Sequence, residues 1–438
     1  MNLKVCKFGG TSMSTKESIR QVKNIIDSDK ERRFVVVSAP GKRYSGDEKI
    51  TDLLYACFDE KQARGSCSIY FDKIRSRFIN LVKELEIDFD VVPYLDEVEQ
   101  GILNSTTPDY CASRGEYLSA ILMSKVLGME FVDASEIIKF NKHGTFDPEF
   151  TNDLVSKRLS LGNGAVIPGF YGTLPNGEIK TFSRGGSDFS GAIIARGVQA
   201  DIYENWTDVD GFMTTDPRIV DNPIIIDYLS YDELRELSYM GASVLHPEST
   251  FPLQATAIPI NIKNTFNPSA KGTMIVKDTS KVPSDRVITG IAGRKGFTTI
   301  FIKKAMMNNE IGFCRKVLSV LEYYGINMEH MPTGIDTMSL IIPDSDLQNG
   351  LEFEIIEKIR GKVNPDFIYV YKDVSLIAIV GHGMSHQYGT AAKVFTALAN
   401  ANINVKMIDQ GSSEINIIVG VNSSDMNRAI SAIYHAFF

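Results

Sequence analysis

The sequence Lys7-Phe8-Gly9-Gly10-Thr11-Ser12 stands where an apolar strand, expected from Leu3 to Phe8, meets a helix. We expect the helix to begin at Ser14, which forms a capping box with Glu17, because apolar residues recur behind it at helical spacing. A strand, loop and helix in this order direct backbone N–H groups at one point, and glycine lets a bulky anion approach the backbone. Lys7 adds a mobile positive charge. The stretch predicts a phosphate-binding loop, and the alternative is an ordinary βα turn with a surface lysine.

The totals of the chain exclude several classes of protein. Its 438 residues allow roughly two to four domains, and a hydrophobic content of 43% suffices for sizeable cores. The net charge of −8, with no basic stripe, gives little support to nucleic-acid or anionic-membrane binding. Five scattered cysteines without a C-x-x-C spacing argue against a disulfide framework or a zinc site. We expect no signal peptide, no membrane span and a cytoplasmic location.

Residues 1–280 alternate short β-branched runs with helical stretches, which is the pattern of a sheet covered by helices. We therefore expect one large α/β domain. Its polar loops follow the strand ends, where open α/β sheets bind ligands. Strands are expected at 34–38, 164–169, 200–206 and 258–262, and helices at 50–63, 68–84, 112–127, 187–198, 231–239 and 248–256.

The last third of the chain contains an internal repeat with a gap-free offset of 77 residues, seen where Gly312 and Asn327 recur as Gly389 and Asn404. Each copy reads strand, helix, strand, strand, helix, as in small βαββαβ modules. The first copy has a fourth strand at 366–372, but the second ends directly after its helix, which would leave a sheet edge open. We predict that residues 286–292 complete the second module. The domains are then 1–280, a first module at 297–373, and a second module at 285–296 plus 374–438.

A second glycine cluster, Ser183-Arg184-Gly185-Gly186-Ser187-Asp188, precedes a helix that we expect to begin at Ser187. Arginine clamps carboxylates and phosphates, so the cluster predicts a second anion-binding loop. The alternative is that Ser187 and Asp188 serve only as helix caps. The chain has no G-x-x-x-x-G-K-[ST], and its G-x-G at Gly381–Gly383 lacks a third glycine. Neither common nucleotide fingerprint applies.

Trp206-Thr207-Asp208-Val209-Asp210-Gly211 ends a strand and turns at Asp-Gly, and residues 214–218 follow directly. Such a turn is also normal surface chemistry. Beside the two glycine loops, Thr207 and Asp208 are candidates to hydrogen-bond a base or ribose, and Arg218 is a candidate for a phosphate.

Together these loops resemble the aspartokinase family of the amino-acid kinase superfamily, over the whole chain. The repeat is similar to the tandem ACT regulatory domains of such enzymes, and no fused homoserine dehydrogenase is expected. The resemblance implies an α/β fold with an amino-acid kinase sheet sandwiched by helices, followed by two βαββαβ (ferredoxin-like) ACT modules. The segments that carry it are KFGGTS at 7–12, VVSAPG at 36–41, SRGEYLSA at 113–120, GFYG at 169–172, SRGGSD at 183–188, WTDVDG at 206–211, TTDPR at 214–218, VLHP at 244–247 and IKNTFNP at 262–268.

The resemblance implies phosphoryl transfer from ATP, with Mg²⁺, to the side-chain carboxylate of L-aspartate. The product is 4-phospho-L-aspartate, on the way to lysine, threonine and methionine. No metal ligand of the protein is expected, and Asp188 orients Lys7 or a magnesium-bound water, since a carboxylate nucleophile needs no base. By match to the family motifs, the ATP site comprises Lys7, Gly9, Gly10, Ser38, Thr207, Asp208 and Arg218, the aspartate site Thr51, Glu116, Arg184 and Ser187, and the catalytic residues Lys7, Arg184 and Asp188. Within the aspartate site, Arg184 contacts a carboxylate and Glu116 the amino group.

The first module is the expected effector site, and lysine, alone or together with threonine, is the expected effector. Met307, Gly312 and Phe313 lead into a helix N-terminus that can take a carboxylate, and Glu329 can pair with an amino group. The open edges of the modules predict a homodimer or homotetramer.

Two positions depart from the family pattern. Ser243 replaces a lysine that many members place near the nucleotide phosphates. Either Lys263 or another lysine takes over its role, or ATP affinity is lower. Met213 replaces a tyrosine that some relatives have. A second hypothesis is an acetylglutamate, glutamate or nucleoside monophosphate kinase, against which the repeat and the segment 113–116 speak. A third is a non-catalytic amino-acid sensor, which Ser243 supports and intact Lys7 and Arg184 oppose.

Overall fold

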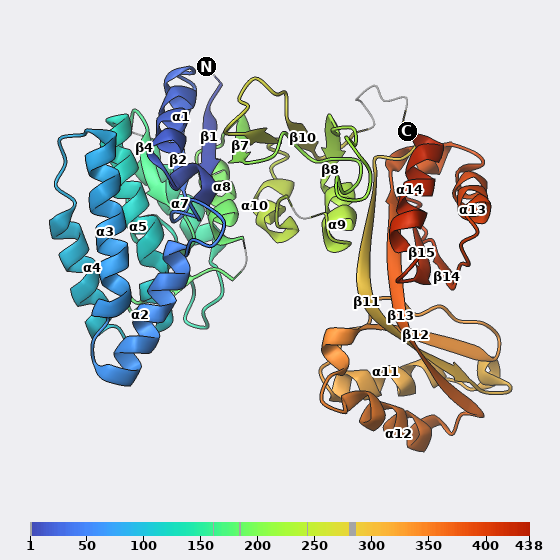
Figure 1. The fold of residues 1–438 in the computed structure, drawn as a ribbon. Helices are drawn as coiled ribbons and strands as arrows, with labels where there is room; N and C mark the ends of the chain where they lie inside the picture. The colour runs from blue at the N-terminus through green and yellow to red at the C-terminus, as the bar shows by residue number, and fades with distance from the viewer. Residues whose placement is uncertain (1, 161, 184, 243, 280–285) are drawn as a thin grey trace. The chain divides into compact units, whose positions relative to one another are not determined.

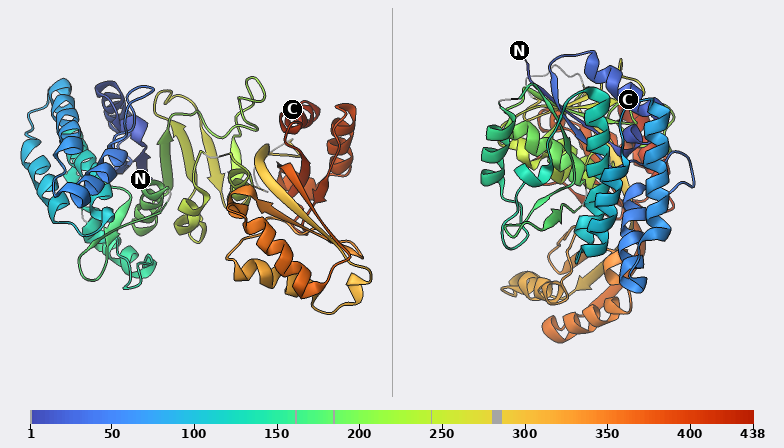
Figure 2. Two further views of the ribbon diagram at one scale, coloured as in Figure 1. Left: turned by 60° about the horizontal axis from the view of Figure 1, so that its bottom comes forward. Right: turned by 90° about the vertical axis from the view of Figure 1, so that its left-hand side faces the viewer.

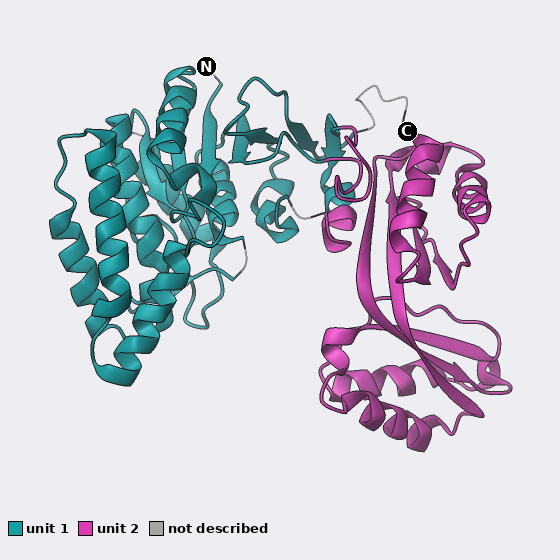
Figure 3. Cartoon of the chain, in the orientation of Figure 1, with its two compact units in different colours: residues 1–212, 225–234, 244–282 teal, residues 213–224, 235–243, 283–438 magenta. Residues whose placement is uncertain are grey.

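The computed structural model in Figure 1 describes residues 2–160, 162–183, 185–242, 244–279 and 286–438. Two of the residues singled out above, Arg184 and Ser243, lie outside the described residues. The chain divides into two compact units (Figure 3), of which the first comprises residues 1–212, 225–234 and 244–282 and the second residues 213–224, 235–243 and 283–438.

The first unit is built on an eight-stranded sheet with the order β3-β4-β2-β1-β7-β9-β10-β8. Neighbouring strands run parallel, apart from the antiparallel pair of β9 and β10. The central strands are buried on both faces and therefore read as apolar runs, such as Phe34–Val37. The strands are β1 Lys4–Phe8, β2 Arg32–Val37, β3 Glu130–Phe131, β4 Ala165–Pro168, β7 Ile202–Thr207, β8 Tyr228–Ser230, β9 Ile260–Asn264 and β10 Thr273–Val276.

Helices cover both faces of this sheet (Figures 1 and 2). One layer, which shares a core with Cys6, Phe8 and Trp206, consists of α1 Lys16–Asp27, α2 Ile50–Arg64, α3 Ser68–Leu85, α4 Val92–Asn104 and α5 Pro108–Leu127. The remaining elements are α6 Ala134–Ile137, α7 Pro148–Leu159, the hairpin of β5 Tyr171–Thr173 and β6 Ile179–Thr181, α8 Gly186–Gly197 and α10 Phe251–Gln254. Helix α9 Tyr231–Tyr239 begins in the first unit, and its residues from 235 on belong to the second. In the part of the chain that the structure describes, no helix has both the length and the apolar content needed to span a membrane.

Two predicted helix starts were wrong by one or two residues. Helix α1 begins at Lys16, and its capping box joins Thr15 and Ser18, whose side chains each accept the other's backbone N–H. Ser14 instead donates its hydroxyl to the Thr11 carbonyl. Helix α8 begins at Gly186 with Gly185 as its N-cap, so that Ser187 lies inside the helix.

The second unit contains the repeat as a five-stranded sheet with the order β12-β11-β13-β15-β14. Helices α11 and α12 pack on one half, and α13 and α14 pack on the other (Figure 1). The elements are β11 Gly290–Lys303, α11 Phe313–Tyr323, β12 Thr337–Pro343, α12 Leu351–Val363, β13 Phe367–Val380, α13 Thr390–Asn400, β14 Met407–Asp409, β15 Asn416–Asn422 and α14 Met426–Phe437.

Strands β11 and β13 each run through both copies of the repeat. The end of β11 pairs with Phe367–Tyr371, whereas its first residues, 290–295, pair with Ser375–Val380 of the second copy. The prediction that the segment before the first copy supplies a strand to the second copy is confirmed, although this strand begins at Gly290 rather than at residue 286. The two copies therefore have separate cores along one continuous ribbon.

Candidate active site

The loop after β1 lies at the carboxyl ends of three adjacent parallel strands, β2, β1 and β7. The Gly9 N–H donates to the Trp206 carbonyl at 3.2 Å, and the Gly41 N–H donates to the Gly10 carbonyl at 2.8 Å. A Cβ atom on Gly10 would lie 2.8 Å from the Ala39 carbonyl oxygen, so no other residue fits without a shift. The glycines thus bring this backbone into close contact with the loop that follows β2.

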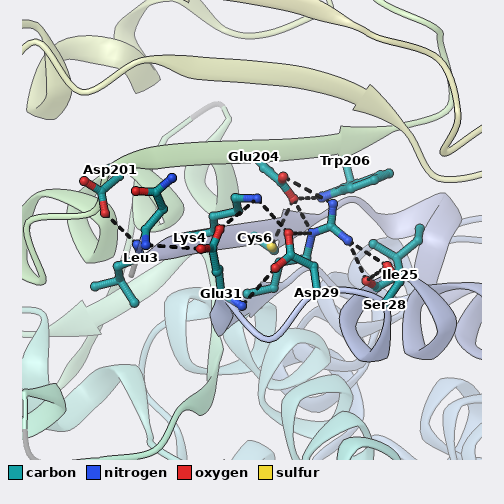
Figure 4. A network of polar contacts seen from close by, with 12 residues as sticks. Leu3, Lys4, Cys6, Ile25, Ser28, Asp29, Glu31, Asp201, Glu204 and Trp206 are labelled. Carbon is teal, nitrogen blue, oxygen red and sulfur yellow. Dashed lines mark hydrogen bonds and ion pairs between the residues drawn. The ribbon is translucent and has the colours of Figure 1, made fainter.

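A buried polar network holds Trp206 behind this loop (Figure 4). Oε2 of Glu204 accepts hydrogen bonds from Trp206 Nε1 at 3.0 Å, from Arg32 Nε at 2.8 Å and from the Cys6 thiol at 3.4 Å. Burial raises the pKa of Cys6 well above its usual range, so the thiol remains a donor. The indole also stacks on Phe8, with ring centroids 5.8 Å apart. Because the Trp206 carbonyl accepts from Gly9, this network fixes one end of the loop.

Lys7 and Asp188 form an ion pair, with 2.5 Å between Nζ and Oδ1. Asp188 lies in the first turn of α8, where a carboxylate is favoured by the helix dipole. Asn205 is the register partner of Lys7 on β7 and donates from Nδ2 to the same Oδ1 at 2.9 Å. The Tyr203 hydroxyl donates to the Asp188 carbonyl at 3.1 Å. Asp188 is therefore oriented by three side chains.

Lys7 and Asp188 line a pocket of about 270 Å³ in the first unit. Its wall consists of Lys7, Ser38, Thr51, Glu116, Phe170, Ser183, Gly185, Gly186, Ser187 and Asp188. The structure thus brings together six predicted site residues from five segments of the chain. The size and polar lining suit a small polar molecule.

Glu116 supplies the pocket with a buried carboxyl group. It lies within α5, and its Oε2 has no hydrogen-bond partner among the described residues. Burial raises the pKa of Glu116 to about 8. A cationic ligand group beside Oε2 would satisfy this oxygen and stabilise its charged form.

The second glycine cluster contributes Gly185 and Gly186 to the pocket wall. Gly185 has a φ of +66°, and a Cβ atom there would lie 2.7 Å from Cβ of His246. The backbone conformation and the neighbour both require glycine. Ser187 and Asp188 line the pocket rather than cap the helix, so the interpretation as mere caps was wrong.

Other predicted residues lie outside the pocket lining. The Thr11 hydroxyl donates to Asp208 Oδ2 at 3.4 Å, which places the segment that follows Thr207 beside the first glycine loop. Arg218 belongs to the second unit, where Nη2 lies 2.6 Å from Oδ2 of Asp216, and Met213 lies in the same unit.

The predicted effector residues all lie in the second unit. Met307 and Phe313 are buried, and Gly312 is the N-cap of α11 with a φ of +78°. Glu329 already has partners: its Oε1 lies 3.5 Å from Nη1 of Arg294, and it accepts a hydrogen bond from Tyr239. Burial, together with Glu329, raises the pKa of Tyr239 to about 12.

Sequence reasoning missed Asn205 and Phe170. Asn205 carried a signal, since it and Glu204 are polar residues inside an otherwise apolar, buried stretch of a central strand, where a polar side chain needs a partner. Phe170 carried none beyond its place between Gly169 and Gly172.

The chain is similar to known proteins over its whole length. It is 38% identical over 454 residues to aspartokinase 3 of Bacillus subtilis (strain 168), which covers 100% of this chain and 99% of that one. Among solved structures, the aspartate kinase of Clostridium acetobutylicum is 50% identical with a TM-score of 0.92. E. coli aspartokinase III in complex with aspartate and ADP is 25% identical with a TM-score of 0.76. Both comparisons cover 100% of each chain.

Family models agree with these similarities. The amino acid kinase family matches residues 2–264, and the ACT domain matches residues 377–437. Together with the pocket and the two glycine loops, these matches show that the chain belongs to the aspartokinase family.

Proposed function

We propose that the protein transfers the γ-phosphoryl group of ATP to the side-chain carboxylate of L-aspartate and releases 4-phospho-L-aspartate and ADP. The observation that carries this proposal is that Lys7, Thr51, Glu116 and Ser187 line one and the same pocket. The E. coli relative, solved with aspartate and ADP, supports both substrates.

The reaction brings two anions together, so catalysis depends on positioning and on cationic and N–H donors. Lys7 neutralises charge that develops on the transferring phosphoryl group, and the N-terminus of α8 adds its dipole. The aspartate carboxylate is already ionised at neutral pH and needs no general base. Asp188 therefore orients Lys7, and Asn205 keeps Asp188 in place.

We place the ATP phosphates at the first glycine loop because a Cβ atom on Gly9 would lie 3.6 Å from Nζ of Lys7, so the loop backbone and this cation face the same point. Thr207 and Asp208, which follow β7 in the same unit, complete the proposed nucleotide site. Among the described residues, no group of three His, Cys, Asp or Glu side chains is placed to hold a metal. Mg²⁺ is therefore expected to be held mainly through the nucleotide phosphates and water, with Asp188 near the water.

Aspartate recognition rests on opposite charges at the two ends of the substrate. The unpaired Oε2 of Glu116 accepts from the substrate ammonium group, and Thr51 and Ser187 offer hydroxyl donors. Arg184 binds a substrate carboxylate as a bidentate fork.

Regulation belongs to the repeat, with residues 297–373 as the first module and 285–296 plus 374–438 as the second. Lysine, alone or with threonine, is the proposed effector, at Met307, Gly312, Phe313 and Glu329. The structure of E. coli aspartokinase III with lysine and aspartate supports lysine. Such control suits a cytoplasmic enzyme at the start of lysine, threonine and methionine synthesis.

The first module also supports assembly into a homodimer or homotetramer. Phe367, Tyr369 and Tyr371 alternate along β13 and therefore share one face of the sheet. Each of these side chains is about half exposed. A row of exposed aromatic residues is a typical contact surface between protein chains.

The product tests this proposal. Purified protein incubated with MgATP, aspartate and hydroxylamine should form aspartate hydroxamate, because an acyl phosphate reacts with hydroxylamine. Hydroxamate formation with acetylglutamate or glutamate in place of aspartate would move the protein to another kinase of the superfamily. An ATP-dependent hydroxamate signal in the absence of any acceptor would show that the signal does not come from an acyl phosphate of the substrate, and the proposed reaction would be wrong.

A further inference from the structure

The loop of residues 39–49 connects Ser38 and Thr51, which both line the pocket. It begins after Ser38 at the end of β2 and ends at α2, whose second residue is Thr51. Near its start, the Gly41 N–H donates to the Gly10 carbonyl at 2.8 Å. The geometry of this loop therefore sets the first glycine loop and Thr51 relative to each other.

Arg77 of α3 reaches into the 39–49 loop from behind. Its guanidinium group donates from Nη1 to the Glu48 carbonyl at 3.0 Å and from Nη2 to the Gly41 carbonyl. Nη1 also lies 3.6 Å from Oδ2 of Asp47. One side chain thus holds both ends of the loop, from a position 29 to 36 residues later in the chain.

The contacts of Arg77 lie in a buried environment. Its side chain is 6% exposed, and burial lowers its pKa below the usual arginine value. Asp47 is held in place by Arg43, whose Nε lies 2.8 Å from Oδ2, and this pair holds the pKa of Asp47 well below its usual range. A charge in such a place is costly unless its hydrogen bonds are made. Two different nitrogens of the Arg77 guanidinium make the two carbonyl contacts, and the single nitrogen of lysine does not reproduce this spread.

We infer that Arg77 is a positioning residue for phosphoryl transfer. It does not line the pocket, and it acts through the Gly41 and Glu48 carbonyls on Gly10 and Thr51. The inference rests on the proposed function, since Gly10 and Thr51 are placed there on ATP and aspartate. A misplacement of about 1 Å at a reacting centre costs roughly 100-fold in rate.

The test compares Arg77→Lys and Arg77→Met with matched changes at Arg75. Arg75 lies on the same helix but pairs with Asp96 and Glu99 of α4, at 2.8 and 2.7 Å. ADP release is measured with the acceptor that the wild-type protein uses. Unfolding is followed by the fluorescence of Trp206, the single tryptophan of the chain, so that activity is expressed per folded molecule.

Arg77→Met should lower kcat per folded molecule about 10- to 100-fold, Arg77→Lys should lie between it and the wild type, and KM for both substrates should change less. The Arg75 variants should keep kcat. Equal kcat per folded molecule in all variants would overturn the inference, as would a loss confined to stability.

If the Arg77 variants do not fold, Asp47→Asn provides the same test of the inference. This change removes the charge that faces Arg77. It should reduce kcat per folded molecule, and an unchanged kcat would overturn the inference. A wild-type protein inactive with aspartate but active with another acceptor would refute the proposed substrate and leave this comparison intact.

Discussion

Nζ of Lys7 lies 2.5 Å from Oδ1 of Asp188, and this pair joins the first strand of the chain to the first turn of α8. Asn205 shares the same carboxylate oxygen, at 2.9 Å from Nδ2. The ammonium group is therefore held in the pocket by a carboxylate that is itself fixed. The positive charge at the proposed site of phosphoryl transfer has a defined position before any ligand binds.

Replacing Lys7 with alanine should reduce kcat by about 10² to 10³, because a cation is lost from the transferring phosphoryl group. The fold should survive. Lys4→Ala is the matched control, since Lys4 lies on the same strand and pairs with Asp29 at 2.6 Å, outside the pocket. Steady-state kinetics and thermal unfolding check both variants. Near-normal turnover of a folded Lys7→Ala protein would exclude the proposed role of Lys7.

Asp188→Asn should lower kcat less than Lys7→Ala and leave the shape of the pH–rate profile unchanged, because Asp188 orients Lys7 and takes no proton from the substrate. The profile is measured from pH 6 to 9 as kcat/KM for aspartate. Disappearance of an acidic limb in Asp188→Asn alone would show that Asp188 acts as a base.

Glu116 should make aspartate binding depend on pH. Its pKa of about 8 means that Glu116 is mostly protonated at neutral pH when the pocket is empty, whereas pairing with the substrate ammonium group requires the charged carboxylate. Aspartate affinity should rise as the pH increases toward 8, and binding at pH 7 should release a proton. Calorimetry in two buffers of different ionisation enthalpy measures this release. Glu116→Gln should abolish it, and an equal release in that variant would contradict the assignment.

The same carboxyl group should affect stability in a defined direction. A folded-state pKa raised above the unfolded value of 4.5 means that the folded protein binds the proton more tightly. The contribution is complete below about pH 4.5 and is lost as the pH rises through 8. As the pH rises from about 4.5 to 8, the wild type should lose unfolding free energy relative to Glu116→Gln, whose side chain does not titrate. A difference that does not change with pH would be inconsistent with the raised pKa.

Arg184→Lys should raise KM for aspartate sharply while KM for ATP changes less, because a point charge does not reproduce a bidentate contact with a carboxylate. Initial rates with each substrate varied in turn test this expectation. Equal losses for the two substrates would mean that Arg184 contacts the nucleotide or supports the loop.

Glu329→Ala should weaken lysine binding by about tenfold or more, because it removes the proposed partner of the effector ammonium group. The effector has to compete with Arg294 and Tyr239 for this carboxylate. Calorimetry with lysine and threonine is the measurement, and Glu322→Ala, an exposed change on α11, is the control. If Glu329→Ala binds both amino acids as the wild type does, another site serves the effector.

The sequence predicted local structure well at positions where the backbone conformation or a close backbone contact permits only glycine. The two glycine loops and the strand ends were predictable, because a close backbone approach and a positive φ leave glycine as the residue that fits, as at Gly10 and Gly185. The start of α1 was not, since Ser12, Ser14 and Thr15 are all suitable caps and tertiary packing selects among them.

Long-range contacts could not be read from the sequence. The pairing of Lys7 with Asn205 depends on the register of strands almost 200 residues apart, and Arg77 meets the 39–49 loop through helix packing. The swapped strand of the second repeat was predictable, because counting strands left one edge without a partner.

The most direct test of the proposed activity is MgATP-dependent ADP release by the purified protein with aspartate, glutamate or N-acetylglutamate as acceptor, each with and without lysine and threonine. We predict that aspartate supports turnover with a kcat/KM far above that for the other two acceptors, and that lysine, alone or with threonine, suppresses it. Turnover with N-acetylglutamate or glutamate in preference to aspartate, or no acceptor-dependent ADP release at all, would contradict the proposal.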